Sequence, residues 1–196
     1  MRAGKFFQLF FIYLYYTLNC FYYLNKMKQT KLINIYGGPG AGKSTAAAGV
    51  FYNLKKLGYD CGLVTEMATE LVYDEAFNVI NDQLYLFAEQ WHRTFRMLGK
   101  VDFIVTDSPF LLNIVYNKND DKDFNRFIFS KIHSLDSLDF FINRSEVFSG
   151  VGRIHSLEQS KEIDKVIKKL AKENGINLID VEQNNAVEKI LEKILN

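Results

Sequence analysis

Cysteine is scarce in this sequence. The 196 residues include only Cys20 and Cys61, with no C-x-x-C pair and no Cys/His cluster at the spacing of metal ligands. A disulfide framework or a structural zinc site needs more cysteines at closer spacing. The sequence therefore argues against both and is typical of a protein from a reducing compartment.

Histidine and net charge are also low. None of the three histidines, His92, His133 and His155, belongs to a nucleophile motif, so we expect surface or half-buried positions for them. The formal net charge is +1, and because residues 1–26 hold three basic residues and no acid, the remainder carries a charge of −2. A nearly neutral body argues against nucleic acid as the main partner.

Residues 6–24 differ from the rest of the chain. They contain no charged residue but include ten of the 29 aromatic residues, which is sufficient length and apolarity for a membrane segment. Three alternatives stay open for residues 1–26: a dispensable or wrongly included extension upstream of Met27, a membrane anchor, or a hydrophobic helix docked on the domain. A cleavable signal peptide is disfavoured because no A-x-A site follows. We expect a cytoplasmic protein with one domain over 27–196, membrane-associated only if this segment is an anchor.

The most informative stretch reads GGPGAGKST and follows the apolar run 32–36 directly. It matches G-x-x-x-x-G-K-S between a strand and a helix, which is the setting of a phosphate-binding loop. Such loops bind phosphates through backbone N–H groups and the helix dipole, and glycine permits the positive φ that we expect at residues 37, 40 and 42. The expected nucleotide-binding residues are Gly37, Gly38, Pro39, Gly40, Ala41, Gly42, Lys43, Ser44 and Thr45. Lys43 would reach the β- and γ-phosphates, and the Ser44 hydroxyl would ligate Mg²⁺.

Two acids come at the ends of later apolar runs. Asp107 ends the run 101–107, as the metal-binding Asp of a Walker B strand does, and Glu66 follows the short run 61–65. Open parallel sheets place their functional side chains at the carboxyl ends of strands. We therefore predict that Asp107 meets Mg²⁺ and that Glu66 faces the ligand. The alternatives are a turn-forming Asp and an acid that complements a helix dipole.

Apolar runs and helical patterns alternate along the chain. The expected strands are 32–36, 61–65, 101–107, 138–142 and 176–181, and helices are expected between them and after the last. On the helix 82–98, the residues Leu84, Phe87, Trp91, Phe95 and Leu98 form the expected buried stripe. This alternation predicts an α/β fold, a doubly wound, five-stranded parallel sheet with helices on both faces.

Two further stretches bear on nucleotide binding. Arg144 and Arg153 lie near the ends of a glycine-bearing loop that could close over a nucleotide as a lid, and Arg153 is expected to contact phosphate. Residues 117–120 match N-K-x-D, the guanine-reading signature of small GTPases. We expect a solvated loop there, because that signature follows a core strand in GTPases and Asp107 does not open a D-x-x-G motif.

Together these motifs resemble the phage and bacterial AAA-type P-loop proteins grouped with the kinase domain of NadR, the ribosylnicotinamide kinase. The similarity lies in INIYGGPGAGKST, the VTE that ends at Glu66, TDSP at 106–109, and NR with GRIHSLEQSKEID over 143–164. It implies a P-loop nucleoside- or nucleotide-kinase-like fold, ATP as phosphoryl donor and Mg²⁺ as cofactor. It also implies that Glu66 acts as base toward the acceptor hydroxyl and that Gln90 and Arg93 help to hold the acceptor. Because Gln90 and Arg93 lie off the expected buried stripe of the helix 82–98, the alternative for both is an exposed helix face.

The expected function is therefore phosphoryl transfer from ATP to a nucleoside, ribosylnicotinamide or nucleoside monophosphate. Lys43, Mg²⁺ and Arg153 would spread the charge that develops on the transferred group, and Arg144 would contact the nucleotide. The partners would be a small-molecule acceptor and, for a homodimer, a second copy of the chain. An alternative is a GTP- or ATP-dependent binding or switch protein, whereas a motor ATPase is disfavoured because no room remains for a separate helical subdomain.

Overall fold

The computed structural model describes residues 28–117, 119, 121–145 and 156–196. The predictions for residues 1–26, for the lid over 146–155 with its Arg153, and for Lys118 and Asp120 of the N-K-x-D match lie outside these residues. The elements are β1 (Lys31–Tyr36), α2 (Lys43–Lys56), β2 (Cys61–Val64), α3 (Ala68–Tyr73), α4 (Phe77–Ile80), α5 (Gln83–Phe95), β3 (Phe103–Thr106), α6 (Leu111–Val115), α7 (Lys122–Ile132), β4 (Ser137–Asn143), α8 (Leu157–Glu173), β5 (Leu178–Glu182), η1 (Gln183–Asn185) and α9 (Ala186–Leu195).

The strands form one five-stranded sheet in the order β2-β3-β1-β4-β5, and every pairing is parallel. In register, Val64 of β2 pairs with Thr106 of β3, and Thr106 pairs with Asn34 of β1. The carboxyl ends of these strands therefore lie along one edge. After β1 the chain forms β2 and β3 on one side of β1 and then crosses to β4 and β5 on the other side. Open α/β sheets bind ligands at such a switch point. The predicted fold class is confirmed.

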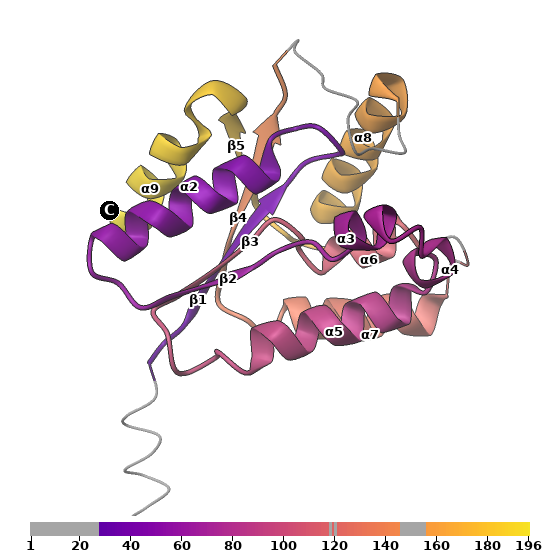
Figure 1. The fold of residues 1–196 in the computed structure, drawn as a ribbon, viewed down its shortest axis with the longest axis horizontal. Helices are drawn as coiled ribbons and strands as arrows, with labels where there is room; N and C mark the ends of the chain where they lie inside the picture. Colours follow the sequence, from indigo (N-terminus) through magenta and orange to yellow (C-terminus); the bar gives the residue numbers. More distant parts are fainter. Residues whose placement is uncertain (1–27, 118, 120, 146–155) are drawn as a thin grey trace, which may run out of the picture.

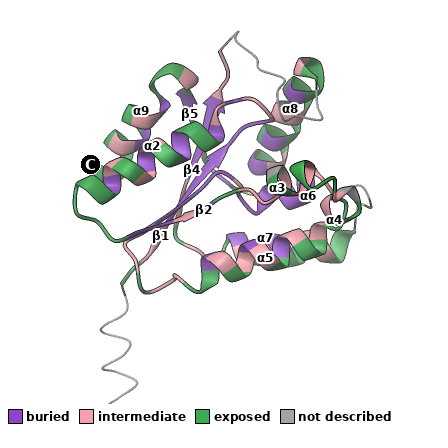
Figure 2. Ribbon diagram, in the orientation of Figure 1, coloured by how far each residue is buried: buried purple, intermediate pink, exposed green. Residues whose placement is uncertain are grey.

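Helices cover both faces of the sheet (Figure 1). Because strand side chains alternate, Ile33 and Ile35 of β1 pack with α2 and α9, whereas Leu32 and Tyr36 pack on the side of α5, α6, α7 and α8. Figure 2 shows the consequence: the central strands are mostly buried, the edge strand β5 is partly exposed, and the longer helices are buried along their inner sides, whereas the short α6 is buried over most of its length. Strands enclosed on both faces read as apolar runs, which is why these segments could be found in the sequence.

The buried stripe predicted for α5 is partly wrong. Leu84 and Phe95 are 62% and 59% exposed, and the buried residues of the helix are Phe87, Gln90 and Thr94. The stripe was drawn through apolar residues alone, but the inner side of this helix includes two polar side chains. Phe87 is covered by the rings of Phe110, Phe124 and Phe127, so aromatic residues from α7 and the start of α6 enclose it.

Several helix ends follow the capping rules. Ser156 and Gln159 form a capping box at the start of α8, and Gly175, with φ of 70°, ends the turn after that helix. Asp82 and Asp121 cap α5 and α7 in the same way through their carboxylates. None of the helices in the described part of the chain is long and apolar enough to cross a membrane.

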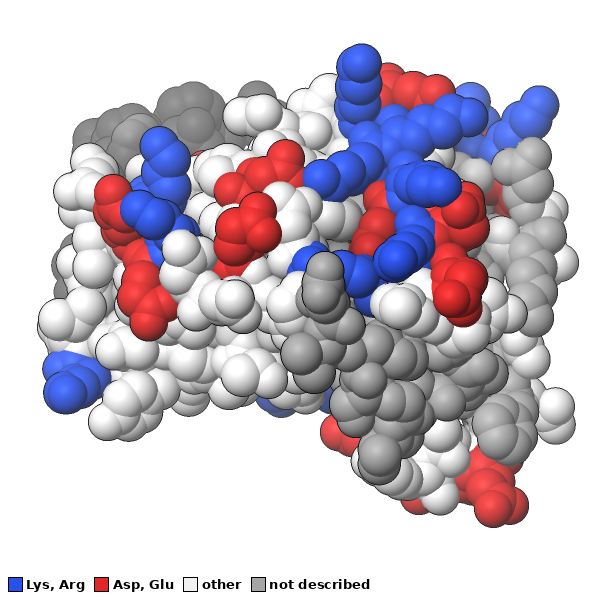
Figure 3. Space-filling view, turned by 90° about the horizontal axis from the view of Figure 1, so that it is seen from above, with Lys and Arg blue, Asp and Glu red and all other residues white. Residues whose placement is uncertain are grey.

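Charged side chains of both signs lie next to each other on the face seen from above the molecule (Figure 3). Within this view, groups of Lys and Arg border groups of Asp and Glu, and uncharged side chains surround these mixed clusters. Exposed ion pairs of the described surface include Lys168 with Asp180 and Lys165 with Glu162. The face seen in Figure 3 therefore carries charges of both signs rather than a patch of one sign.

Candidate active site

The loop between β1 and α2 has the backbone that its glycines predict. The φ angles are 149° at Gly37, 86° at Gly40 and 90° at Gly42, all in the region that side-chain-bearing residues rarely adopt. A Cβ at Gly37 would also lie 2.8 Å from the Cβ of Ala41. The loop therefore needs glycine both for its dihedral angles and for its close packing.

The helix that follows the loop provides a favourable end for an anion. α2 has 14 residues and no acid in its first turn, so the positive end of its dipole is not neutralised. Lys43 is only 7% exposed and its Nζ lies 3.5 Å from the carbonyl oxygen of Gly38, which places the ammonium group over the loop. Ser44 and Thr45 are exposed at the start of the helix. These groups match what a triphosphate requires.

Asp107 lies directly after β3, at the same edge of the sheet. It is 2% exposed, and its Oδ1 accepts a hydrogen bond of 2.9 Å from the backbone N–H of Glu66. Within the described residues it forms no ion pair with Lys or Arg. The structure thus brings together the two acids that the sequence singled out, and the buried carboxylate of Asp107 fixes the backbone at Glu66.

The oxygen donors at this edge suit Mg²⁺. The Ser44 hydroxyl and the Asp107 carboxylate are hard ligands, and Mg²⁺ commonly takes one or two such ligands from the protein and the others from phosphate and water. Within the described part of the chain, no group of three or more His, Cys, Asp and Glu side chains could hold a metal ion by itself. The donor set therefore fits a cation shared with a bound triphosphate.

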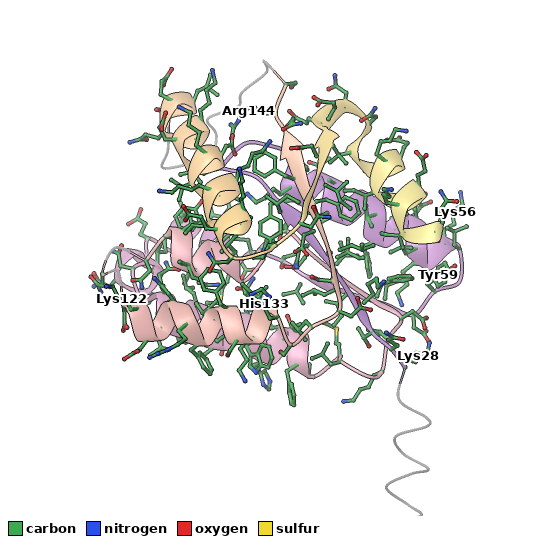
Figure 4. The ribbon with its side chains drawn as sticks, turned by 180° about the vertical axis from the view of Figure 1, so that it is seen from behind. Lys28, Lys56, Tyr59, Lys122, His133 and Arg144 are labelled. Atoms are coloured by element: carbon green, nitrogen blue, oxygen red, sulfur yellow. The ribbon has the colours of Figure 1, made fainter. Side chains whose placement is uncertain are left out.

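Arg144 lies between the end of β4 and α8 (Figure 4). Its guanidinium donates to Oδ2 of Asp164 from Nε at 2.8 Å, and its Nη1 donates to the carbonyl oxygen of Pro39 at 3.2 Å. The pair is well shielded, with 11% and 17% of the two side chains exposed. Arg144 therefore reaches the phosphate-binding loop through its Pro39 carbonyl, and its contact with the nucleotide stays a prediction.

Asp164 is a residue that the sequence reasoning missed. Its Oδ1 accepts a hydrogen bond of 2.6 Å from the backbone N–H of Gly38, so one carboxylate joins the loop to Arg144. A Cβ at Gly38 would lie 2.6 Å from the carbonyl oxygen of Ser160 and 2.9 Å from Oδ1 of Asp164. The available signal is the spacing of α8, where Ser160 and Asp164 occupy the same side as the buried residues Ile167 and Ala171.

Gln183 is a second missed residue. Its side chain lies against Gly42, and its Oε1 accepts hydrogen bonds from the N–H and the hydroxyl of Ser145 at 2.8 and 2.9 Å. It follows β5 directly, so the rule that identified Glu66 and Asp107 also applies to it. The segment after β5 and the segment after β4 therefore meet beside the loop.

The structure differs from the prediction for Gln90, one of the two residues expected to hold the acceptor. This side chain, predicted to lie off the buried stripe, is 8% exposed, and its Oε1 accepts from Nδ2 of Asn113 at 2.9 Å. Arg93 is half-buried, and its Nη2 lies 3.6 Å from Sδ of Met67, the neighbour of Glu66. Arg93 therefore approaches the segment after β2, and its contact with an acceptor stays a prediction.

Tyr116, at the end of α6, is influenced by the acids of the same region. Burial raises the pKa of its hydroxyl, and the carboxylates of Glu66 and Asp164 raise it further. Both acids are therefore close enough to Tyr116 to influence it electrostatically, although they come from different elements.

The loop, the parallel sheet and the acid after β3 define a P-loop NTPase of the α/β class. The family model described as "AAA domain" matches residues 32–189, and the chain belongs to this family. No curated protein sequence matches the chain at a significant level.

Solved structures with this fold include three kinases or kinase-related proteins. The NadR protein in complex with NR has a TM-score of 0.61 at 16% identity over 84% of this chain and 51% of that chain, so this chain spans about half its length. Thymidylate kinase from Ehrlichia chaffeensis has a TM-score of 0.58 at 14% identity over 85% and 99%. Deoxyadenosine kinase from M. mycoides, with bound dATP, has a TM-score of 0.50 at 21% identity over 84% and 100%. The kinase-like fold implied by the sequence motifs is confirmed.

Proposed function

We propose that this chain is an ATP-dependent kinase that transfers the γ-phosphoryl group to a nucleoside, ribosylnicotinamide or nucleoside monophosphate. The observation that carries the proposal is the hydrogen bond between the Glu66 backbone and the buried carboxylate of Asp107. It fixes an acid with a half-buried side chain at the edge of the sheet where the phosphate-binding loop begins. A protein that only bound a nucleotide would need the loop and Asp107 but no second acid.

The residues of the loop bind and orient the donor. Backbone N–H groups between Gly37 and Thr45 hold the phosphates, and the ammonium group of Lys43 offsets charge on the β- and γ-phosphates. Ser44 and Asp107 hold Mg²⁺, which when bound neutralises charge on the triphosphate oxygens. Arg153 supplies further positive charge to the transferred group, an effect of about 10³- to 10⁵-fold on the rate where such an arginine has been measured.

Glu66 acts on the acceptor. Its carboxylate takes or orients the proton of the attacking hydroxyl, which contributes about 10²- to 10⁴-fold in typical enzymes. Asp107 positions it through the backbone bond. Gln90 and Arg93 hold the part of the acceptor that does not react, and the solved structures with the same fold, which include a thymidylate kinase and a deoxyadenosine kinase, make a nucleoside-type acceptor the natural candidate.

Release of ADP tests the proposal. Purified protein with ATP and Mg²⁺ is screened against nucleosides, ribosylnicotinamide and nucleoside monophosphates, with GTP as the comparison donor. ADP is expected to form only when a suitable acceptor is present, and phosphorylated acceptor is expected in equal amount. The proposal would be contradicted if ADP were released without an acceptor, or if the protein used GTP as donor but not ATP.

A further inference from the structure

Gln90 carries an unpaired polar atom in the interior. The side chain is 8% exposed, its Oε1 accepts from Asn113, and its Nε2 is buried without a hydrogen-bond partner in the described structure. An amide nitrogen has two hydrogens to donate. A buried donor left unpaired is destabilising, so such a group is retained where it serves a purpose.

Asn113 determines which atom of Gln90 is left free. Nδ2 of Asn113 donates to Oε1 of Gln90 at 2.9 Å and to the carbonyl oxygen of Phe110 at 3.2 Å. A backbone carbonyl can only accept, so the Phe110 carbonyl holds Asn113 with its nitrogen on this side. Asn113 then presents only an N–H donor to Gln90, so the oxygen of Gln90 accepts this hydrogen bond. The nitrogen of Gln90 is thereby directed away from Asn113.

Both residues belong to the acceptor side of the site. Gln90 lies one turn before Arg93 on α5, and Arg93 contacts Met67 next to Glu66. Asn113 lies on α6, which starts shortly after Asp107 and is situated between α5 and α8 (Figure 1). Asn113 is itself 5% exposed, so the pair is enclosed. In the proposed function Arg93 and Glu66 hold the acceptor, so an acceptor bound there is the partner that we assign to Nε2 of Gln90.

We propose that Asn113 is a positioning residue that sets the specificity for the acceptor. By holding Oε1 of Gln90, it leaves a single free donor, so the site selects a nucleoside that presents an exocyclic carbonyl oxygen. An amino group at the same position would place two donors against each other and leave both unpaired. The inference rests on the proposed function for its substrate class, and it concerns the choice of base rather than the transfer of phosphate.

Matched pairs of nucleosides test this selectivity by equilibrium binding. Thymidine is compared with 5-methyl-2′-deoxycytidine, and inosine with adenosine, by isothermal titration calorimetry on the wild-type protein. The carbonyl-bearing member of at least one pair is expected to bind about ten- to a hundredfold more tightly, since the rejected member leaves a buried donor unpaired. Equal affinities within both pairs, a preference for the amino members, or no binding of any of the four would overturn the proposal.

Two substitutions of Asn113 separate orientation from packing. In Asn113→Asp the carboxylate only accepts, so Nε2 of Gln90 turns toward it and Oε1 becomes the free atom, which is expected to reverse the preference toward the amino members. In Asn113→Leu neither orientation is held, and the preference is expected to fall to within about threefold. A wild-type preference that persists in both variants would refute the role of Asn113. A merely structural role would weaken binding of both members alike and would not reverse their order.

The controls distinguish the possible failures. Asn177→Asp makes the same change at an exposed residue before β5 and is expected to leave the preference unchanged. ATP binding and thermal unfolding of each variant show whether its fold is intact, and the wild-type pairs decide the question if a variant does not fold. A protein that phosphorylates both members equally well would retain the proposed function and refute this inference. A protein that binds the carbonyl members selectively but transfers no phosphate would support this inference and refute the proposed function.

Discussion

Glu66 and Asp107 are two carboxylates at one edge of the sheet with different surroundings. Asp107 is 2% exposed and accepts a hydrogen bond from the backbone, whereas the side chain of Glu66 is half-buried, and its charge helps to raise the pKa of Tyr116. A buried acid held by backbone is suited to a fixed role such as cation binding, and a partly accessible acid can exchange a proton with a ligand. The different environments support the separate roles assigned to them.

Replacement of Glu66 by Gln tests the second role. The amide keeps the size of the side chain but cannot accept the proton, so the rate of phosphoryl transfer is expected to fall by about 10²- to 10⁴-fold, with ATP affinity almost unchanged. Steady-state kinetics and calorimetry measure the two effects. Glu70→Gln, an exposed acid on the adjacent α3, is the matched control. If Glu66→Gln were fully active, the role of base would move to Asp107.

At this scale the sequence revealed residues that belong to a local motif. Gly37, Gly40 and Gly42 could be predicted because their spacing requires positive φ, and Asp107 because it ends a buried strand. The roles of Asp164 and Asn113 could not, since they depend on contacts with residues far away in the chain. Gln183 follows a strand as Asp107 does, but its contact with Ser145 is equally distant in the sequence. Nothing in a single sequence shows that the carboxylate of Asp164 meets the N–H of Gly38, 126 positions away.

At the scale of elements, α8 is joined to the phosphate-binding loop. The carboxylate of Asp164 accepts from Gly38 and pairs with Arg144, whose guanidinium also donates to the carbonyl oxygens of Pro39 and Ser160. Arg144 follows β4 and Asp164 belongs to α8. The arrangement thus joins the end of β4 and α8 to the phosphate-binding loop.

Asp164→Asn is expected to weaken this connection. It removes the charge that pairs with Arg144 and is expected to lower the free energy of unfolding by about 1–3 kcal/mol, because a shielded guanidinium loses its ionic partner. Urea denaturation measures the change. Asp180→Asn breaks the ion pair between Asp180 and Lys168, whose side chains are 54% and 43% exposed, respectively. This substitution is expected to lower the free energy of unfolding by less than about 1 kcal/mol. Equal effects of the two substitutions would refute the connection.

Element positions were predicted better than element faces. The strands and most helices were found because the apolar runs and capping residues are local signals, but the short α4 was missed. The inner face of α5 was predicted from apolar residues only, and apolar character is a poor guide on α8 as well, where Val166 is 42% exposed. Polar residues such as Gln90 and Ser160 occupy inner positions because a tertiary contact needs them there.

For the whole molecule, the fold depends on a sheet that is covered on both sides. One face is closed by α2 and the C-terminal helix α9, with Val50, Leu54 and Ile190 fully buried between them and the strands. The doubly wound topology could be predicted because five apolar runs alternate with helices and connections of this kind are right-handed. The order of the strands could not, because no local signal specifies which neighbour a strand takes.

Truncation of Ile190 tests the contribution of α9. Ile190→Ala leaves a cavity against α2 and is expected to lower the free energy of unfolding by about 2–5 kcal/mol. Leu195→Ala, on the same helix but 44% exposed, is expected to lower it by less than about 1 kcal/mol. Chemical denaturation of both variants decides this, and similar small effects would mean that α9 does not close the core.

The most direct measurement is the affinity for ATP with Mg²⁺, determined by calorimetry for the wild-type protein, Lys43→Ala and Lys56→Ala. Both lysines belong to α2, but Lys43 lies over the phosphate-binding loop, whereas Lys56 is exposed at the far end of the helix (Figure 4). Loss of Lys43 is expected to weaken binding by about ten- to a hundredfold or more, because a charged partner of the phosphates disappears, and Lys56→Ala is expected to bind as the wild type does. Unchanged affinity in Lys43→Ala, with the protein folded, would contradict the assignment of residues 37–45 as the site of the triphosphate.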